Sequence, residues 1–525
     1  MIIIARILKF LLVLKEPHSK KSLIAKNTML LYMRMLVLLA ISLYTSRIIL
    51  SSLGVEDFGL YNVVGGVVTI FAFLSSAMAN SSNRFITYSL PSGDNKHISK
   101  VISLTYTTHI LLSILVILLA ETLGLYLLLN KMTIPVDRVA ACMWVFQFSV
   151  IACVFNIISI PFNAVIIAHE QMGMYAVISI IEAVLKLAIA LIIQASEGDR
   201  LILYAGLMVL VNVVTYCIYR FYCSRKFEVA KNVRIIFNKF EELKEMFFFA
   251  GWSLIGNLAV AGFTQGLNIL LNIFFGPVVN AARAIAVQIQ GLVKSFVVNF
   301  QTAVNPQIIK TYACNELEQL HSLIIFSSKL SYFMLLCMTL PLILEVKIVL
   351  NIWLNDVPEY AIVFTRLILI ISLVDALSNP LNIAINATGN IKKYQIVEGG
   401  TLLMILPLSY FTVKLGAPPE SVLLIQMLIT YLVQIIRVFI VCPEIKLSKI
   451  TYLKEVILPV ISVTLVSVVI AVFARTLFPQ GTLYSLLMML LSVMLVMSVA
   501  YIVGLKASER TTLNHKIRSF IKPER

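Results

Sequence analysis

Two stretches of the chain share a pattern that decides how its fold is organised. Residues 161–175 read PFNAVIIAHEQMGMY, and residues 380–394 read PLNIAINATGNIKKY. Four residues recur at a constant offset of 219, namely Pro161, Asn163, Ala168 and Tyr175 and their counterparts Pro380, Asn382, Ala387 and Tyr394. A second region, Gly54 to Ile86, matches Gly276 to Ile308 at an offset of 222. Two matched regions in the same order indicate a duplicated unit of about six helices.

The segments around these stretches are strongly apolar. Of the 525 residues, 60% are hydrophobic and 13% are charged, and the mean hydropathy is +0.94. An average soluble domain has about 25% charged residues, so a soluble enzyme, a disordered chain and a coiled coil are excluded. At about 20 residues per membrane-spanning helix, the apolar runs predict fourteen spans, at 29–50, 58–80, 101–130, 138–168, 172–194, 200–223, 246–274, 277–300, 322–346, 360–386, 393–414, 420–441, 452–474 and 482–505.

The distribution of positive charge predicts how these spans cross the membrane. The net charge is +16, from 42 Lys and Arg against 26 Asp and Glu. If the N-terminus lies inside, 28 basic residues fall in inner segments and 6 in outer segments. Basic residues collect on the cytoplasmic side of membrane proteins. We therefore expect both termini in the cytoplasm, and we interpret the basic balance as a topological signal, not as a nucleic-acid surface.

The spans and the repeat together predict an all-α polytopic membrane protein with two six-helix bundles and two additional C-terminal helices. Residues 1–28 are predicted to form a cytoplasmic tail or interfacial helix, and residues 506–525 a basic cytoplasmic tail. Between them we expect an N-terminal bundle at 29–223, a cytoplasmic linker at 224–245, a C-terminal bundle at 246–441 and the two further helices at 442–505.

The sequence offers no enzyme chemistry. It has no phosphate-cradling GxxxxGK[ST] loop, no HExxH metal motif and no GxSxG nucleophile motif. The six histidines and seven cysteines have no metal-ligand spacing. We therefore expect no catalytic residue, no metal and no cofactor. Duplicated membrane bundles that can rock about a central site are typical of transporters.

A family resemblance enters at residues 53–68, LGVEDFGLYNVVGGVV, which follow a first span ending in YTSRIIL. With residues 81–88 and the proline-centred fourth span, this segment resembles polysaccharide repeat-unit flippases of the Wzx type. These belong to the multidrug/oligosaccharidyl-lipid/polysaccharide exporter superfamily, which includes the MATE transporters. The resemblance runs from about Ser22 to the C-terminus, and residues 1–21 depart from the pattern.

The resemblance implies both a fold and a function. The fold would be MATE-like, with two six-helix bundles around a central cavity. The activity would be translocation of undecaprenyl-pyrophosphate-linked oligosaccharide across the bacterial inner membrane, for O-antigen or other surface polysaccharide. The implied partners are this lipid-linked oligosaccharide, membrane lipid, and polysaccharide polymerase or export proteins. Such a cargo needs cations for its phosphates and amides or hydroxyls for its sugars.

Basic and amide residues inside the spans are therefore candidates for substrate binding. Arg283 and Lys294 lie 11 residues apart, which returns to within about 20° of the same helix face, and Gln290 lies on that face too. Similar spacing places Asn62 on a polar face of the second span and Asn268 on one of the seventh. Two other intramembrane cations complete the predicted set, Arg47 and Lys186. Pairing with acids, or helix packing, is the structural alternative for each.

Intramembrane acids are candidates for coupling to protons or cations. Asp375 begins a polar face that continues through Asn379, Asn382 and Asn386. Glu182 precedes Lys186 by four residues, which favours an ion pair within one helix. Three other basic residues lie near predicted cytoplasmic ends, where we expect their side chains to extend to the interface: Arg34, Lys329 and Arg437.

Two rival functions remain on the sequence alone. A cation-coupled drug or toxin antiporter of the same superfamily would be expected to have an acidic cavity, whereas the stripe in the eighth span is basic. A polytopic glycosyltransferase, polymerase or ligase would carry a long outer catalytic loop. The longest predicted outer loop, near Glu345–Glu359, has about 15 residues.

Overall fold

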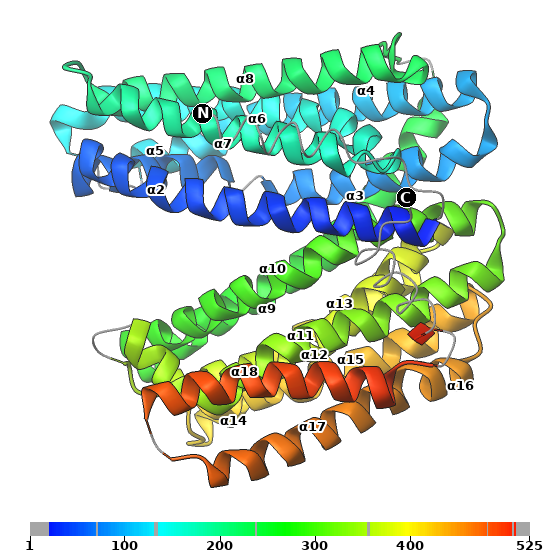
Figure 1. Ribbon diagram of the computed structural model, residues 1–525. Coiled ribbons are helices and arrows are strands. Elements are labelled where there is room, and N and C mark those ends of the chain that lie inside the picture. The colour runs from blue at the N-terminus through cyan, green and yellow to red at the C-terminus, as the bar shows by residue number, and fades with distance from the viewer. Residues whose placement is uncertain are drawn as a thin grey trace, which may run out of the picture. The chain divides into compact units, whose positions relative to one another are not determined.

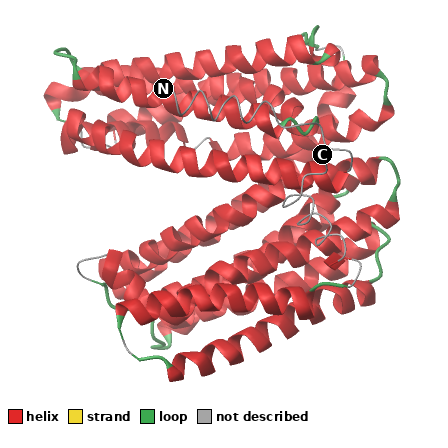
Figure 2. Cartoon of the chain, viewed as in Figure 1, coloured by secondary structure: helices red, strands yellow, loops and turns green. Residues whose placement is uncertain are grey.

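The computed structural model describes residues 20–69, 72–130, 135–236, 239–353, 357–479, 481–506 and 509–510. All the elements in these ranges are helices, joined by short loops and turns (Figure 2). They form two compact units, Met1–Asn257 and Leu258–Arg525. Of the predicted N-terminal tail or interfacial helix, residues 1–19 lie outside the described residues and residues 20–28 form the start of α2. Most of the basic C-terminal tail also lies outside the described residues.

The first unit consists of the helices up to the middle of α9. Its elements are α2 (Lys20–Thr69), α3 (Ala72–Ser89), η1 (Leu90–Ser92), α4 (Asn95–Leu119), η2 (Ala120–Gly124), α5 (Leu125–Asn130), η3 (Val136–Arg138), α6 (Val139–Ala168), α7 (Met172–Gln194), α8 (Arg200–Lys226), η4 (Glu228–Ala230) and the start of α9 (Phe240–Phe275) (Figure 1). Asp94 and Asp199 cap α4 and α8 by accepting hydrogen bonds from backbone amides of the first turn, which marks where these helices begin.

The second unit begins within α9 and contains the remaining helices. They are α10 (Pro277–Ala313), α11 (Leu317–Trp353), α12 (Ala361–Thr388), α13 (Lys392–Leu403), α14 (Ile405–Lys414), α15 (Glu420–Glu444), α16 (Lys449–Tyr452), η5 (Leu453–Ile457), α17 (Leu458–Leu477), α18 (Thr482–Val499) and η6 (Ala500–Gly504).

All fourteen predicted spans fall on helices, or on runs of consecutive helices, in this structure. Among the described residues, eleven helices are long and apolar enough to cross a membrane. The other three predicted spans correspond to the two parts of α2, the second continued by α3, and to α10. The chain is therefore an all-helical, multi-pass membrane protein, as the composition predicts.

The two units share several helix pairings, although the packing of α2 on α7 has no equally extensive counterpart for α9. In the first unit α6 packs against α3, α4 and α8, and in the second unit α12 packs against α10, α11 and α15. The α3–α4 pair of the first unit corresponds to the α10–α11 pair of the second. The α7–α8 pair corresponds to the packing of α13 and α14 against α15. This agreement is what a duplicated unit predicts, with the proline-bearing helices α6 and α12 at equivalent central places.

Two glycines at equivalent places of the repeat share a backbone conformation that other residues avoid. Gly54 interrupts α2 with φ 78° and ψ 169°, and Gly276 precedes α10 with φ 78° and ψ −173°. This region of backbone space is essentially restricted to glycine. The offset of 222 residues found in the sequence therefore aligns two identical breaks between the first two helices of each unit.

The two additional C-terminal helices pack on α11. Polar contacts run along this interface: Glu345 pairs with Arg475 at 2.5 Å, the Tyr332 hydroxyl bonds to that of Thr464, and Tyr452 donates to Ser328. Gly504 permits close approach at one end, because an added Cβ would lie 2.6 Å from the ring of Phe333. The hairpin of α17 and α18 is thus a fixed part of the second unit.

Candidate functional site

The predicted polar stripe of α10 faces neighbouring helices of the second unit. Arg283 is buried and donates to Asn268 on α9, so two predicted substrate-binding residues contact each other. Gln290 donates to the Ser372 hydroxyl on α12 at 2.7 Å. One turn further along, Lys294 meets Asp375. The stripe therefore forms a ladder of polar contacts between α9, α10 and α12.

The Lys294–Asp375 ion pair joins a predicted binding residue to the predicted coupling residue. The Lys294 ammonium lies 2.6 Å from the Asp375 carboxylate, and both side chains are about one third exposed, at 35% and 34%. Arg283, in contrast, is only 4% exposed. Of these charged groups, the Lys294–Asp375 pair is the one that a ligand can reach without unpacking the unit.

Gln301 replaces the backbone hydrogen bond that Pro380 removes from α12. A proline inside a helix leaves the carbonyl four residues before it without its helical donor. For Pro380 that carbonyl belongs to Ala376, and the side-chain amide of Gln301 donates to it at 3.3 Å. The same amide donates to Ser331 on α11. Gln301 therefore stabilises the interrupted part of α12 that begins directly after Asp375.

The polar face of α12 extends from Asp375 along the helix. Asn382 accepts a hydrogen bond from the Tyr394 hydroxyl, so two of the four residues that recur in the repeat contact each other. The side-chain oxygens of Asn379 and Asn386 are buried and have no partner among the described residues. A buried acceptor without a partner is costly, and a ligand hydroxyl could satisfy these two oxygens only where the packing around α12 opens.

The remaining predicted site residues lie in the first unit. On α7, Lys186 lies 2.6 Å from Glu182, which confirms the ion pair expected from their spacing of four. This pair belongs to the first unit, whereas Lys294 and Asp375 belong to the second. The side chains of Arg47 and Asn62, both on α2, lie outside what the structure describes.

The interpretation of Arg437 and Lys329 as interface-seeking side chains is wrong. Arg437 is buried in the second unit and pairs with Glu398 on α13, while it also donates to the Tyr394 hydroxyl at 3.0 Å. Lys329 is 1% exposed and pairs with Glu509 at 2.8 Å. Both charges are satisfied by acids distant in the sequence, so they have no need to reach the interface.

Sequence reasoning also missed a charged cluster in the first unit. Arg138 pairs with Asp57, which follows the Gly54 break, and with Asp199 at 2.9 Å. Arg200 donates to the Ser52 carbonyl. These contacts hold the interrupted part of α2 to the loops at the ends of α5 and α7. Asp57, Arg138 and Asp199 come from distant parts of the sequence, and only their folded positions reveal the cluster.

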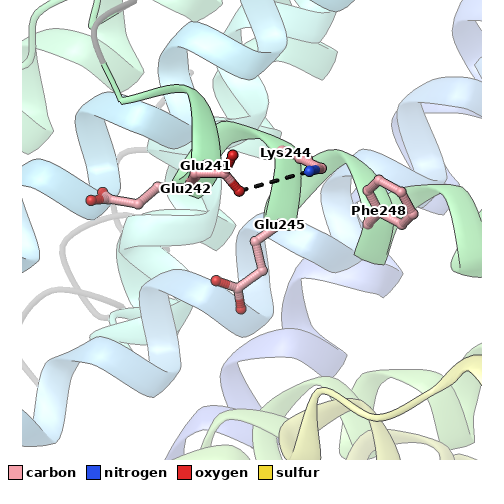
Figure 3. A pocket seen from close by; sticks show the side chains of 5 residues that line it. All are labelled: Glu241, Glu242, Lys244, Glu245 and Phe248. Carbon is pink, nitrogen blue, oxygen red and sulfur yellow. Dashed lines mark ion pairs between the residues drawn. The ribbon is translucent and has the colours of Figure 1, made fainter.

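A pocket of about 530 Å³ lies at the first turns of α9. Figure 3 shows its lining side chains, three glutamates with one lysine and one phenylalanine, and the ion pair between Glu241 and Lys244. Among the described residues no group of three or more His, Cys, Asp or Glu side chains could hold a metal ion. The pocket therefore shows no metal-binding arrangement.

Comparisons with known proteins identify the fold. No protein-family profile matches the chain, and no curated protein matches its sequence. An outward-facing multidrug resistance MATE family transporter of the MOP superfamily matches with a TM-score of 0.68, 14% identity, and 82% of this chain and 99% of that chain covered. A MOP superfamily transporter from Pyrococcus furiosus, described by a reverse polarity of its binding pocket that suggests a different function, matches with a TM-score of 0.65 at 14% identity over 82% and 99% of the chains.

A MATE protein in a bent conformation gives a similar result, with a TM-score of 0.66 and 15% identity over 81% of this chain and 96% of that one. These matches extend over both units and nearly the whole of each neighbour, although the sequences have diverged widely. The chain therefore has the fold of the MATE transporters of the MOP superfamily.

Proposed function

We propose that this chain is a flippase that moves a polyprenyl-pyrophosphate-linked oligosaccharide across the bacterial cytoplasmic membrane by alternating access. The observation that carries the proposal is the accessible Lys294–Asp375 pair at one end of the amide face of α12. A membrane-embedded charge is costly and is retained chiefly for function. Here the Lys294 cation matches the charge of the pyrophosphate, and the amides of α12 match the hydroxyls of the glycan.

The chemistry of binding follows from the geometry of the pair. A pyrophosphate would compete with the Asp375 carboxylate for the Lys294 ammonium, since both are oxygen anions. Protonation of Asp375 would weaken its hold on Lys294 and favour the phosphate. Asn379 and Asn386 lie one and three turns further along α12, and their oxygens, which are buried in this structure, would accept bonds from sugar hydroxyls in a state of the transport cycle that opens this face. This scheme couples release of Lys294 to a proton and needs no bond-making step, which agrees with a transporter.

The cation-coupled drug antiporter is the second candidate, and one specific observation favours it. Asp375 neutralises Lys294, so the pair as a whole carries no net positive charge. A cationic cargo would bind the Asp375 carboxylate, and it would compete with Lys294 for that carboxylate. One of the similar structures is itself described as a multidrug resistance transporter. The two candidates therefore differ in which member of the pair binds the cargo.

Single neutralisations of the pair distinguish the candidates. If Lys294 binds pyrophosphate, Lys294→Gln should weaken binding of a labelled polyprenyl-pyrophosphate oligosaccharide to purified protein about tenfold or more, which is about 1.4 kcal/mol. Asp375→Asn should retain binding but lose dependence on the proton gradient. In a flippase-deleted host, both variants should then lose surface polysaccharide, normalised to the amount of membrane protein.

Arg366→Gln is the matched control, because Arg366 lies on the same helix α12 and its exposed guanidinium bonds only to the Ile343 carbonyl among the described residues. It should retain both binding and surface polysaccharide. The opposite pattern, in which the wild-type chain restores no surface polysaccharide to the deleted host and Asp375→Asn loses binding of a cationic drug, would favour the antiporter.

The location and partners belong to the same proposal. The proposed membrane is the bacterial inner membrane, with both termini cytoplasmic, because basic residues dominate the segments assigned to that side. The glycan would be joined to its lipid on the cytoplasmic face and used on the outer face. An enzyme that polymerises or exports the glycan is therefore the expected partner.

A further inference from the structure

The segment that follows α8 is packed onto the first unit along α4. Val229 and Ala230 are buried, and Val233 and Ile236 contact the same hydrophobic core. Two backbone amides fix its course, since Arg234 donates to the Ser103 hydroxyl at 3.3 Å and Ile236 donates to the Thr107 hydroxyl at 2.9 Å. The segment predicted as a linker is thus held in a defined conformation. Its backbone is fixed on α4, so its exposed side chains start from defined positions.

An open pocket of about 530 Å³ lies between this segment and the first turns of α4. Two cations line it, Lys100 from α4 and Arg234 from the segment, together with the polar side chains of Ser99 and Asn232. Arg234 is exposed, and its guanidinium has no side-chain partner among the described residues. Ile235, which also lines the pocket, is 49% exposed.

Lys100 is held on one side of the pocket by Glu242, 2.6 Å away at the start of α9. Figure 3 shows Glu242 on this first turn, directed away from the Glu241–Lys244 pair. Both members of the Lys100–Glu242 pair are more than one third exposed, at 36% and 41%. Exposed pairs of this kind contribute little to stability, so an incoming anion can replace Glu242 as the partner of Lys100.

We propose that this pocket binds the headgroup of an anionic phospholipid, with the phosphate between Arg234 and Lys100 and an acyl chain against Ile235. The helical run from Asn95 to Asn130 has 36 residues, well beyond the roughly 20 that cross the apolar core. Its first turns therefore lie at the headgroup level. A basic pocket with an adjacent exposed apolar side chain at that level matches a lipid headgroup in charge and polarity.

Binding of phosphatidylglycerol to the purified full-length protein in detergent tests the proposal. We expect saturable binding by native mass spectrometry and a rise in the thermal midpoint. Arg234→Gln should weaken binding about fivefold, the effect of one basic residue near an anionic surface. The double variant with Lys100→Gln should weaken it further. Lys231→Gln removes the same charge from an exposed position on the same segment that does not line the pocket, and it should bind as the wild type does.

Three results would overturn the proposal. Equal losses in Arg234→Gln and Lys231→Gln would mean a diffuse surface attraction. Equal binding of phosphatidylcholine would remove the requirement for an anion. A full stabilising effect from inorganic phosphate alone would assign the pocket to a soluble phosphate compound. The midpoint of each variant without lipid separates a folding defect from lost binding, and none of these measurements depends on the transport activity.

Discussion

Arg437 shows what a buried charge requires inside a membrane protein. Its guanidinium contacts Glu398, the Tyr394 hydroxyl and the Gln434 side chain, so each of its nitrogens has a partner. The desolvation cost of such a group is large, and it is offset only while the ion pair and its hydrogen bonds remain complete. Removing one member leaves the other as an uncompensated charge.

We therefore expect Arg437→Ala to destabilise the protein by about 3–5 kcal/mol, as is typical when one partner of a buried pair is removed. The double variant Arg437→Met and Glu398→Gln should recover most of this loss. Arg366→Ala, at an exposed guanidinium, should change stability by no more than about 0.5 kcal/mol. Thermal unfolding in detergent measures all three. An unchanged midpoint in Arg437→Ala would mean that its charge is solvated after all.

The polar stripe shows how far sequence reasoning reaches at this scale. Helical spacing correctly placed Arg283, Gln290 and Lys294 on one face of one helix. It could not show that Lys294 would meet Asp375, 81 residues away, because ion pairs between helices depend on how those helices pack. For the same reason Arg437 was misjudged, since its partner lies 39 residues before it on another helix.

At the scale of elements, the existence of the helices was predictable and their ends were not. The length of an apolar run reflects the thickness of the membrane core. A helix can continue beyond that core, because its backbone hydrogen bonds do not depend on apolar side chains. The helix α10 continues 13 residues beyond the predicted end at residue 300, through Pro306 to Ala313. Its 37 residues extend about 55 Å at 1.5 Å per residue, well beyond an apolar core of about 30 Å.

The two glycines at equivalent places of the repeat give a test of whether both units have the same helix break. Gly54→Ala and Gly276→Ala should each destabilise the protein by about 1–3 kcal/mol, because both positions have φ 78° in a region that alanine avoids. No neighbouring atom lies within 4 Å of an added Cβ at either site, so the cost is one of backbone conformation.

Gly251→Ala is the matched control for these glycines. Gly251 lies inside α9 with equal open space, so alanine should be neutral or slightly stabilising there. Melting curves of the three purified variants would make the comparison. Equal stability of Gly54→Ala and wild type would mean that α2 is not interrupted at this residue.

At the scale of the whole molecule, the two units share a framework but differ in charge. Asp375 of α12 corresponds, at the repeat offset of 219, to the uncharged Asn156 of α6. The charged pair that we propose to bind the pyrophosphate therefore has no counterpart at that position in the first unit. The repeat could be predicted from short motifs, because duplication preserves the residues that shape helix breaks and kinks while substrate chemistry diverges.

The orientation of the whole chain gives a further prediction. Reporter fusions within residues 231–236 and at the C-terminus should both report the cytoplasm, and a fusion at Ala417, between α14 and α15, should report the periplasm. The basis is the excess of basic residues in the segments assigned to the inner side. A periplasmic C-terminus would instead require an odd number of spans.

Transport of the proposed cargo in a defined system tests the account most directly. The measurement is movement of a fluorescent polyprenyl-pyrophosphate oligosaccharide between the leaflets of proteoliposomes that contain the purified chain, followed by accessibility to a membrane-impermeant quencher. We predict protein-dependent movement that is lost in Lys294→Gln and retained in Arg366→Gln. Absence of movement in the wild-type protein, with proton-driven uptake of a cationic drug by the same vesicles, would contradict the flippase and establish the antiporter in its place.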